Sequence, residues 1–211
     1  LLSFLCNLQH VTQCSAIGAL YSTCPQTGKT LDSSSLRSIV SVTDVHDQFG
    51  RPLKDLRISV TDRCNFRCRY CMPRERFNDD HAFLPKRAFL SFEEIEKVVR
   101  SSMSLGLEKV RITGGEPLLR KNLPELIEKL SKLDIDIALT TNASLLKKNA
   151  KALHDAGLNR VTVSLDALDP DLHKKMSDSN IPVESILEGI NEAVQVGLSP
   201  VKINCVVQKG I

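Results

Sequence analysis

A short pattern occurs three times in this chain and limits the kind of fold that it can form. The pattern is x-Gly-Leu-x-x-Val-x-Ile/Val, and its copies begin at Leu105, Ala156 and Val196. In each copy the glycine ends a helical run, and the valine lies in a run of β-branched residues. Strands that alternate with helices in this way predict a parallel sheet with right-handed crossovers.

The whole segment after residue 55 follows the same alternation. We expect strands at residues 56–61, 110–113, 135–140, 161–165 and 201–207. We expect a first helix that starts at a capping box of Ser91 and Glu94, a second that starts at Asn122, and two more at about 144–156 and 183–196. About five βα units predict an α/β fold, either a (β/α) barrel or part of one, with an open doubly wound sheet as the alternative.

The expected strands have one apolar and one polar face, because side chains alternate along a strand. The apolar face, which we expect to lie under the helices, carries Val110, Ile112, Val161, Val163, Val201 and Ile203. The opposite face carries hydroxyls and cations, namely Arg57, Thr61, Arg111, Thr113, Thr140, Thr162, Ser164, Lys202 and Asn204. Because unpaired buried charge is costly, this face predicts a wet or ligand-filled cavity, and its cations favour an anionic ligand. A solvated face, or pairing with carboxylates, is the alternative.

Composition argues against nucleic acid and membranes as partners, and it separates an N-terminal segment from the rest of the chain. A net charge of +3, no Trp and two Tyr indicate neither nucleic acid nor a membrane surface as a partner. Seven cysteines in an α/β pattern indicate a reducing compartment, the cytoplasm or the mitochondrial matrix. Residues 1–48 are an N-terminal extension, either a targeting segment or a disordered one, in which Cys6, Cys14 and Cys24 receive no role. Residues 49–211 are the expected functional core.

Three thiols lie in one short loop with the spacing Cys-x3-Cys-x2-Cys, at Cys64, Cys68 and Cys71. A [4Fe-4S] cluster normally takes four cysteine ligands, so three ligands leave one iron open to a small molecule. The alternative is a zinc site with a fourth ligand such as Cys205 or a histidine. Structural zinc sites usually show paired Cys-x2-Cys or Cys/His spacings, and this sequence has no second pair. The spacing therefore favours an iron–sulfur cluster.

The other distinctive residues follow the expected strands, where parallel α/β folds bind ligands. They are Thr113-Gly114-Gly115-Glu116-Pro117, Thr140-Thr141-Asn142 and Ser164-Leu165-Asp166. The glycine pair lets the backbone approach a ligand closely, and Asn142 is a candidate helix cap. With the cysteine loop, these motifs resemble the radical S-adenosylmethionine (SAM) superfamily. Residues 56–68, 109–118 and 201–204 narrow the resemblance to the GTP 3',8-cyclase family, also called the molybdenum cofactor biosynthesis protein A family, over about residues 49–210.

The resemblance implies a fold, a reaction and a set of site residues. The fold is an incomplete six-stranded TIM-like barrel, and the reaction is radical cyclisation of GTP, a lyase step of molybdenum cofactor biosynthesis. Cys64, Cys68 and Cys71 would ligate the [4Fe-4S] cluster, and no catalytic side chain beyond these ligands is assigned. Contacts to SAM would come from Tyr70, Gly115 and Ser164. Contacts to GTP would come from Arg57, Arg111, Thr140 and Lys202. An electron donor is an implied partner, and a homodimer is a possible assembly.

The chain departs from the family in two ways. Ala143 stands where the family has glycine, and a left-handed backbone there would cost about 1 kcal/mol or more. The family's sixth strand and second cluster are not found before Ile211, so we expect this chain to bind one cluster and SAM without completing cyclisation. Cys205 is expected to be a small core residue. The alternatives are a single-cluster radical enzyme with another substrate, and a non-catalytic metal-binding module.

Overall fold

Strands and helices alternate through residues 45–210, the part of the chain that the computed structural model describes. The strands are β1 (Asp55–Ser59), β2 (Lys109–Thr113), β3 (Asp136–Thr141), β4 (Arg160–Ser164) and β5 (Lys202–Asn204). The α-helices are α1 (Phe92–Met103), α2 (Leu123–Ser131), α3 (Leu146–Asp155), α4 (Pro170–Ser177) and α5 (Val183–Gln195), with short 3-10 helices η3 (Lys86–Ala88) and η4 (Pro117–Leu119). The extension predicted at 1–48 lies mostly outside the described residues, and Cys6, Cys14 and Cys24 lie wholly outside them.

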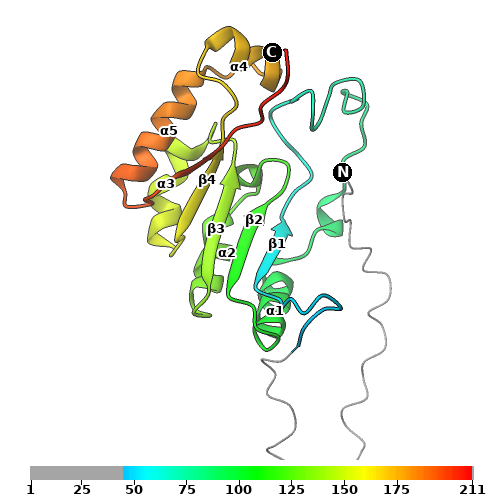
Figure 1. Cartoon of the computed structure of the whole chain (residues 1–211), viewed down its shortest axis with the longest axis vertical. Coiled ribbons are helices and arrows are strands. Elements are labelled where there is room, and N and C mark those ends of the chain that lie inside the picture. The colour runs from blue at the N-terminus through cyan, green and yellow to red at the C-terminus, as the bar shows by residue number, and fades with distance from the viewer. Residues whose placement is uncertain (1–44, 211) are drawn as a thin grey trace, which may run out of the picture. The chain divides into compact units, whose positions relative to one another are not determined.

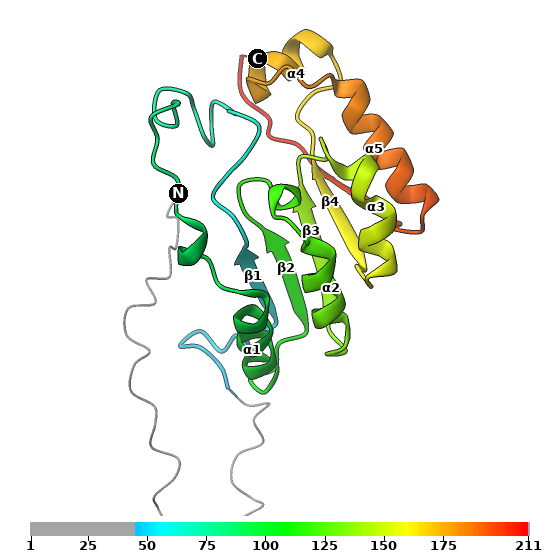
Figure 2. The same cartoon turned by 180° about the vertical axis from the view of Figure 1, so that it is seen from behind.

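The strands form one parallel sheet in the order β1-β2-β3-β4-β5. Helices α1, α2, α3 and α5 all lie on one face of this sheet, which faces the reader in Figure 2, while Figure 1 shows the opposite face. Within the described residues β1 and β5 are both edges, so the sheet does not close there. The predicted α/β fold with about five βα units is confirmed.

The core lies between the sheet and these helices. The strand residues beneath the helices are at most 1% exposed, namely Val110, Ile112, Ile137, Leu139, Val161 and Val163. They meet the apolar helix residues Ile95, Val99, Leu126, Ile127, Leu130, Leu146, Leu153 and Ile186 in one cluster. The register supports this packing, because it places Val110 beside Ile137 and Leu139 beside Val161. The sequence prediction for this face is therefore confirmed for β2 and β4, and β3 follows the same pattern.

The prediction for the last strand is wrong in two respects. The strand is Lys202–Asn204 rather than 201–207, and Ile203 is 45% exposed instead of buried. The strand is short because β5 pairs only with β4 among the described residues, so one of its edges has no ladder to extend it. Cys205, predicted to be a core residue, is exposed.

The helix starts agree with the sequence in one case and differ in another. At α1 the capping box is present, because the Ser91 hydroxyl accepts from the Glu94 N–H at 3.1 Å and the Glu94 carboxylate accepts from the Ser91 N–H at 2.7 Å. Asn122 precedes α2 as predicted, but it is left-handed (φ 60°) and its side chain makes no capping bond. The strand and helix pattern did not predict helix α4. Asp169 caps its start, because the Asp169 carboxylate accepts from the Leu172 N–H at 2.8 Å.

Candidate cofactor site

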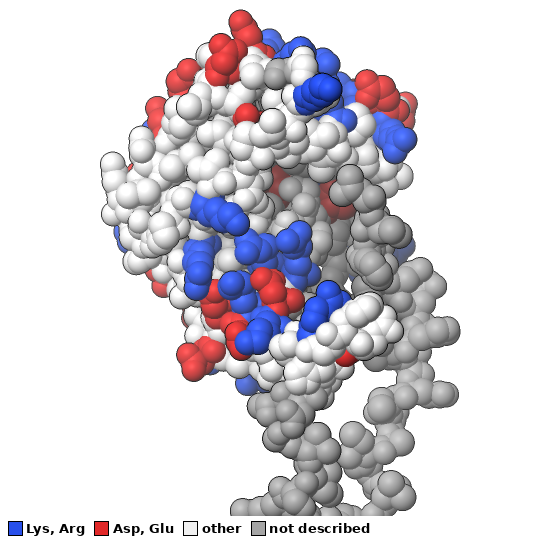
Figure 3. All heavy atoms as spheres, in the orientation of Figure 1, with Lys and Arg blue, Asp and Glu red and all other residues white. Residues whose placement is uncertain are grey.

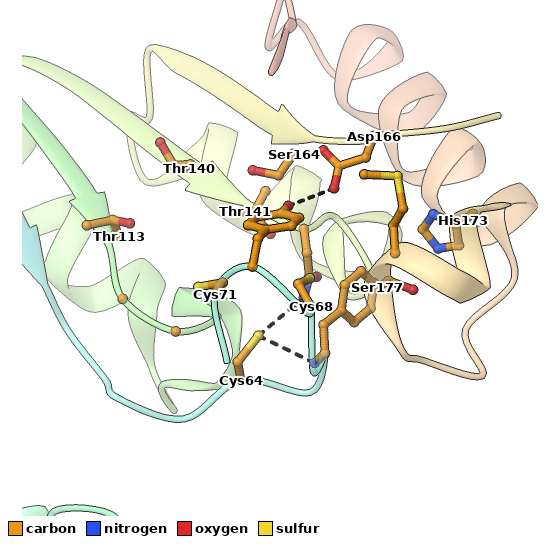
Figure 4. A pocket seen from close by; sticks show the side chains of 16 residues that line it. Cys64, Cys68, Cys71, Thr113, Thr140, Thr141, Ser164, Asp166, His173 and Ser177 are labelled. Atoms are coloured by element: carbon orange, nitrogen blue, oxygen red, sulfur yellow. Dashed lines mark hydrogen bonds between the residues drawn. The ribbon is translucent and has the colours of Figure 1, made fainter. Parts of the chain in front are cut away.

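A pocket of about 220 Å³ opens at the carboxyl ends of β1 to β4. Segments far apart in the sequence supply its walls, as Figure 4 shows. The cysteine loop after β1 contributes Cys64, Phe66, Cys68, Tyr70 and Cys71, and the other strand ends contribute Thr113, Gly114, Gly115, Thr140, Thr141, Asn142, Ser164 and Asp166. The structure thus brings together the three predicted cluster ligands, the three residues predicted to contact SAM, and Thr140.

The cysteine loop is held in place by its own turns and by α4. The N–H groups of Cys71 and Met72 both donate to the Cys68 carbonyl at 2.9 Å. The loop also donates to the end of α4, from the Arg67 N–H to the Ser177 carbonyl at 2.9 Å. The Arg67 side chain donates to the Cys64 carbonyl at 2.7 Å, which closes the loop on itself. The backbone that carries the thiols is therefore fixed by hydrogen bonds on both sides.

The thiols suit a cluster better than a single metal ion. Burial raises the pKa of the Cys64 and Cys71 thiols and raises the pKa of Cys68 to about 12, so the free thiols are protonated at neutral pH. Bound iron would reverse this, since a coordinating thiol loses its proton. Nowhere in residues 45–210 do three His, Cys, Asp or Glu side chains converge on a point that could hold one metal ion. A cubane does not need such convergence, because each cysteine binds a different iron.

The glycine pair after β2 is required because residues 61–63, which lead into the cysteine loop, pack directly against it. The Gly115 N–H donates to the Thr61 carbonyl and the Glu116 N–H donates to the Arg63 carbonyl, both at 2.7 Å. A Cβ atom on Gly114 would lie 2.5 Å from the Thr61 carbonyl oxygen, and one on Gly115 would overlap Arg63. The sequence suggested a close approach to a ligand. The structure shows in addition a close approach of two backbone segments, which sets the pocket wall.

Glu116 links this wall to the end of β3. It is 1% exposed, and its carboxylate accepts from the Thr141 hydroxyl (2.7 Å), the Asn142 N–H (2.7 Å) and the Leu118 N–H (3.0 Å). Burial raises the pKa of this carboxyl, and the three hydrogen bonds oppose that effect. Sequence reasoning gave Glu116 no role, because its partners Thr141 and Asn142 come from a distant segment that no local pattern relates to it.

Asn142 does not cap α3, but it orders the turn before it. Its side-chain oxygen accepts from the Ser144 N–H at 3.0 Å, and its amide donates to the Asn65 side chain at 2.9 Å and contacts the Cys64 sulfur at 3.9 Å. The next residue, Ala143, has φ 61° and is fully buried. The sequence raised this conformation only as a conditional cost; the structure shows that the backbone is left-handed, and alanine bears the cost.

The predicted SAM contacts include one residue with a clear partner. The Tyr70 hydroxyl donates to an Asp166 carboxylate oxygen at 2.7 Å, as the dashed line in Figure 4 shows. Burial, followed by this hydrogen bond, raises the pKa of Tyr70, so the phenol keeps its proton. Ser164 ends β4 and points into the same pocket (Figure 4).

The residues predicted to contact GTP lie on the open face of the sheet. One of them, Thr140, also lines the pocket. Figure 3 shows Lys and Arg side chains gathered on that face. Lys109 and Arg160 there share the Asp136 carboxylate. Arg111 instead donates to the hydroxyls of Thr140 and Thr162, at 3.4 and 3.3 Å.

The three predicted GTP-binding cations differ from their neighbours. Within residues 45–210, Arg57, Arg111 and Lys202 have no carboxylate at ion-pair distance. Arg57 lies directly beside Arg111 in the β1–β2 register, although like charges at neighbouring positions repel. This arrangement favours an anion over the open face.

Sequence reasoning missed the wall that α4 forms. His173, Met176 and Ser177 line the pocket, and the Phe66 and His173 rings meet edge to face at 6.0 Å. His173 and Ser177 are 5% and 4% exposed, and neither His173 Nε2 nor Ser177 Oγ finds a hydrogen-bond partner in the described part of the chain. The available signal was Asp169-Pro170, an N-cap followed by proline at the first helical position.

With this geometry established, comparison with known families decides the class. A model described as the radical SAM superfamily matches residues 58–211. The chain belongs to the radical SAM superfamily. Solved structures share the fold: Streptococcus suis SuiB bound to S-adenosylmethionine has a TM-score of 0.63 at 22% identity, over 75% of this chain and 35% of that chain. Methylornithine synthase (PylB) has a TM-score of 0.55 at 16% identity, over 84% and 56%.

Curated relatives are closer in sequence. The GTP 3',8-cyclase of Staphylococcus epidermidis is 53% identical over 169 residues, which cover 79% of this chain and 49% of that protein. The enzyme of Staphylococcus carnosus is 54% identical over 172 residues, which cover 81% and 50%. The predicted resemblance is confirmed, and the chain spans about half the length of the curated relatives that it matches. In the described part of the chain no helix is long and apolar enough to cross a membrane.

Membership of this superfamily implies a [4Fe-4S] cluster and SAM as cofactors. The residues present fit both groups. Three thiols from one anchored loop supply the donor set of a cluster with one open iron. The adjoining pocket is lined by the glycine pair and Ser164, whose carbonyl and hydroxyl oxygens suit a ligand that carries an ammonium group and hydroxyls.

Proposed function

We propose that this chain is the radical SAM core of a GTP 3',8-cyclase, which converts GTP to (8S)-3',8-cyclo-7,8-dihydroguanosine 5'-triphosphate in molybdenum cofactor biosynthesis. The observation that carries the proposal is the combination of the cysteine-lined pocket with a neighbouring sheet face on which Arg57, Arg111 and Lys202 have no carboxylate partner within residues 45–210. Relatives more than 50% identical to this chain bear that name.

At the cofactor end of the site, the side chains of this chain would bind and orient the cluster and SAM. When bound, the cluster and SAM supply the electron transfer and the radical chemistry. Cys64, Cys68 and Cys71 would hold the cluster, with the third thiol nearest to solvent. Tyr70, Gly115 and Ser164 would contact SAM, and the walls around them would exclude water from reactive species.

The substrate end would hold GTP by its charge. Arg57 and Arg111 lie side by side on β1 and β2, Lys202 lies on the same sheet face on β5, and Thr140 lies where that face meets the pocket. Arginine binds phosphate oxygens in pairs, and lysine contributes a point charge. A triphosphate over this face would relieve the repulsion between Arg57 and Arg111 while its nucleoside reached toward the cofactor pocket.

Anaerobic reconstitution with iron and sulfide tests the cluster. We expect a brown protein with four irons per chain in the cubane centre, and we expect that Cys64→Ser, Cys68→Ser and Cys71→Ser each remove its spectrum. Cys205→Ser is the matched control and should leave the spectrum unchanged, because this thiol does not line the pocket. A colourless protein that binds zinc instead would refute the proposal and favour the metal-binding module.

The cysteine loop and pocket would also serve a radical enzyme with another substrate, and ligand protection separates the two. GTP should protect Lys202 from an amine-reactive reagent, while exposed Lys151 on α3 should react equally with and without GTP. Equal labelling of Lys202 under both conditions would remove GTP as the ligand of this face.

The remaining parts of the proposal concern partners and location. An electron donor is needed to reduce the cluster, and a homodimer is the proposed assembly. The division into an extension at 1–48 and a core at 49–211, and a location in the cytoplasm or the mitochondrial matrix, stay predictions from the sequence.

A further inference from the structure

Asp166 has an unusual position in the pocket wall. It follows β4 by two residues, on the same side as Ser164, and both side chains line the pocket. One carboxylate oxygen accepts from the Tyr70 hydroxyl at 2.7 Å, and the other accepts from the Val206 N–H at 2.9 Å. The Asp166 carbonyl accepts from the Cys205 thiol at 3.2 Å. Asp166 therefore joins the cysteine loop to the segment that follows β5.

The hydrogen bonds from Tyr70 and Val206 are the interactions that hold the Asp166 carboxylate in place. In the described part of the chain no Lys, Arg or His lies at ion-pair distance from Asp166. A carboxylate without a cation is held by its hydrogen bonds, and bonds to an ionised acceptor are the stronger kind. Each oxygen has one donor from a different segment, so loss of the carboxylate removes a restraint from both segments.

Tyr70 depends on this contact more than a core residue would. Its side chain is 48% exposed, so packing restrains the ring on one side only. The segment after β5 is also weakly held, because β5 is an edge strand of three residues within residues 45–210. A side chain that fixes both of these elements sets the shape of the pocket between them.

We propose that Asp166 is a positioning residue that shapes the SAM pocket by holding Tyr70 and the segment after β5 in their binding positions. The proposal rests on the proposed function, because it takes SAM as the pocket's ligand. Preorganised walls bind more tightly, since the ordering cost is met before the ligand arrives. Loss of the Asp166 contacts should therefore weaken SAM binding without removing the cluster, whose ligands Asp166 does not replace.

The experiment measures SAM affinity and cluster content separately in the anaerobically reconstituted chain. The variants are Tyr70→Phe, Asp166→Ala and their combination, and the control is Cys205→Ser, which keeps a donor to the Asp166 carbonyl. Affinity is read from the change in the electron paramagnetic resonance spectrum of the reduced cluster as SAM is added. We expect wild-type iron and sulfide in every variant. Tyr70→Phe, which loses one hydrogen bond, should bind SAM about tenfold more weakly, and Asp166→Ala, which loses two, should bind it more weakly still.

The double variant decides whether the two residues act as one unit. If Asp166 acts through Tyr70, the double variant binds SAM no more weakly than Asp166→Ala alone. Losses that multiply, or wild-type affinity in both single variants, would overturn the inference. Asp166→Asn keeps the side-chain volume and one acceptor, so it should fall between wild type and Asp166→Ala. A wild-type chain that assembles its cluster but binds no SAM would instead refute the proposed function, and this is read before any variant.

Discussion

At the scale of single residues, the most constrained side chain is Glu116. A buried carboxylate is costly unless its oxygens are satisfied, and here three donors from two segments satisfy them. The donors come from the residues after β2 and after β3, so Glu116 fixes the distance between two walls of the pocket. Glu116 stabilises the fold through these three donors, because each of them would otherwise be buried without a hydrogen-bond partner.

We expect Glu116→Ala to lower the free energy of unfolding by about 3 kcal/mol or more, because three buried donors lose their acceptor. Glu116→Gln should cost less, since the amide keeps one acceptor oxygen. Urea denaturation with a constant slope measures both values. Ser101→Ala, an exposed substitution on α1, is the control and should change stability by less than about 0.5 kcal/mol. A loss below about 1 kcal/mol for Glu116→Ala would show that the anchor is not needed.

Ala143 shows how opposing terms permit an unusual residue. Its left-handed backbone costs about 1–2 kcal/mol. Its fully buried methyl group returns about 0.8 kcal/mol, and alanine also restricts the unfolded chain by about 0.4–1 kcal/mol relative to glycine. These terms nearly cancel, so the departure from glycine does not argue against the fold.

At the scale of elements, the helices differ in what determines their ends. Helix α1 is set locally, by the reciprocal bonds of Ser91 and Glu94. Helix α2 begins after the left-handed Asn122 without a side-chain cap, and its apolar face is buried at Leu123, Leu126, Ile127 and Leu130. The first start can be predicted from sequence, while the second is decided by packing.

This difference can be measured at the two helix starts. We expect Ser91→Ala to lower the free energy of unfolding by about 1 kcal/mol, because the Glu94 N–H loses its acceptor. Asn122→Gly should have little effect or be stabilising, because glycine adopts φ near 60° freely and no capping bond is lost. Thermal and urea denaturation report both. A large loss at Asn122 with none at Ser91 would reverse this assignment.

At the scale of the whole molecule, the sheet separates two environments. One face is covered by helices and forms the core, and the other presents cations that outnumber their carboxylate partners. Arg57 and Arg111 lie side by side on that second face, and Lys202 lies beside Thr162. An anion that binds there stabilises the folded state by mass action.

We expect GTP at 100 times its Kd to add about 2.7 kcal/mol of stability, or roughly 5–10 °C in Tm for a chain of this size. Arg111→Ala should remove most of this shift, because Arg111 is a predicted phosphate contact and a charged hydrogen bond contributes about 1.5–3 kcal/mol. Lys132→Ala is the matched control, since Lys132 follows α2 on the opposite side and pairs with Glu128. A GTP shift that survives in Arg111→Ala would place the nucleotide elsewhere.

The sequence alone determined the α/β class, four of the five strands to within two residues, the capping box and the set of motifs around the pocket. It could do so because these features depend on local patterns: alternation along a strand, a glycine after a helix, and the spacing of three thiols in one loop. The glycine of the family showed what a left-handed backbone at Ala143 would cost, but only the structure shows that the backbone is left-handed.

The tertiary structure decided what depends on contacts between distant segments. The buried carboxylate of Glu116, the fit of the glycine pair against Thr61 and Arg63, and the Tyr70–Asp166 bond each join residues that no local pattern relates. The exposure of Ile203 depends on which elements cover β5, which a strand's own sequence does not encode. Local propensity acts over a few residues, whereas burial and hydrogen-bond satisfaction are properties of the folded neighbourhood.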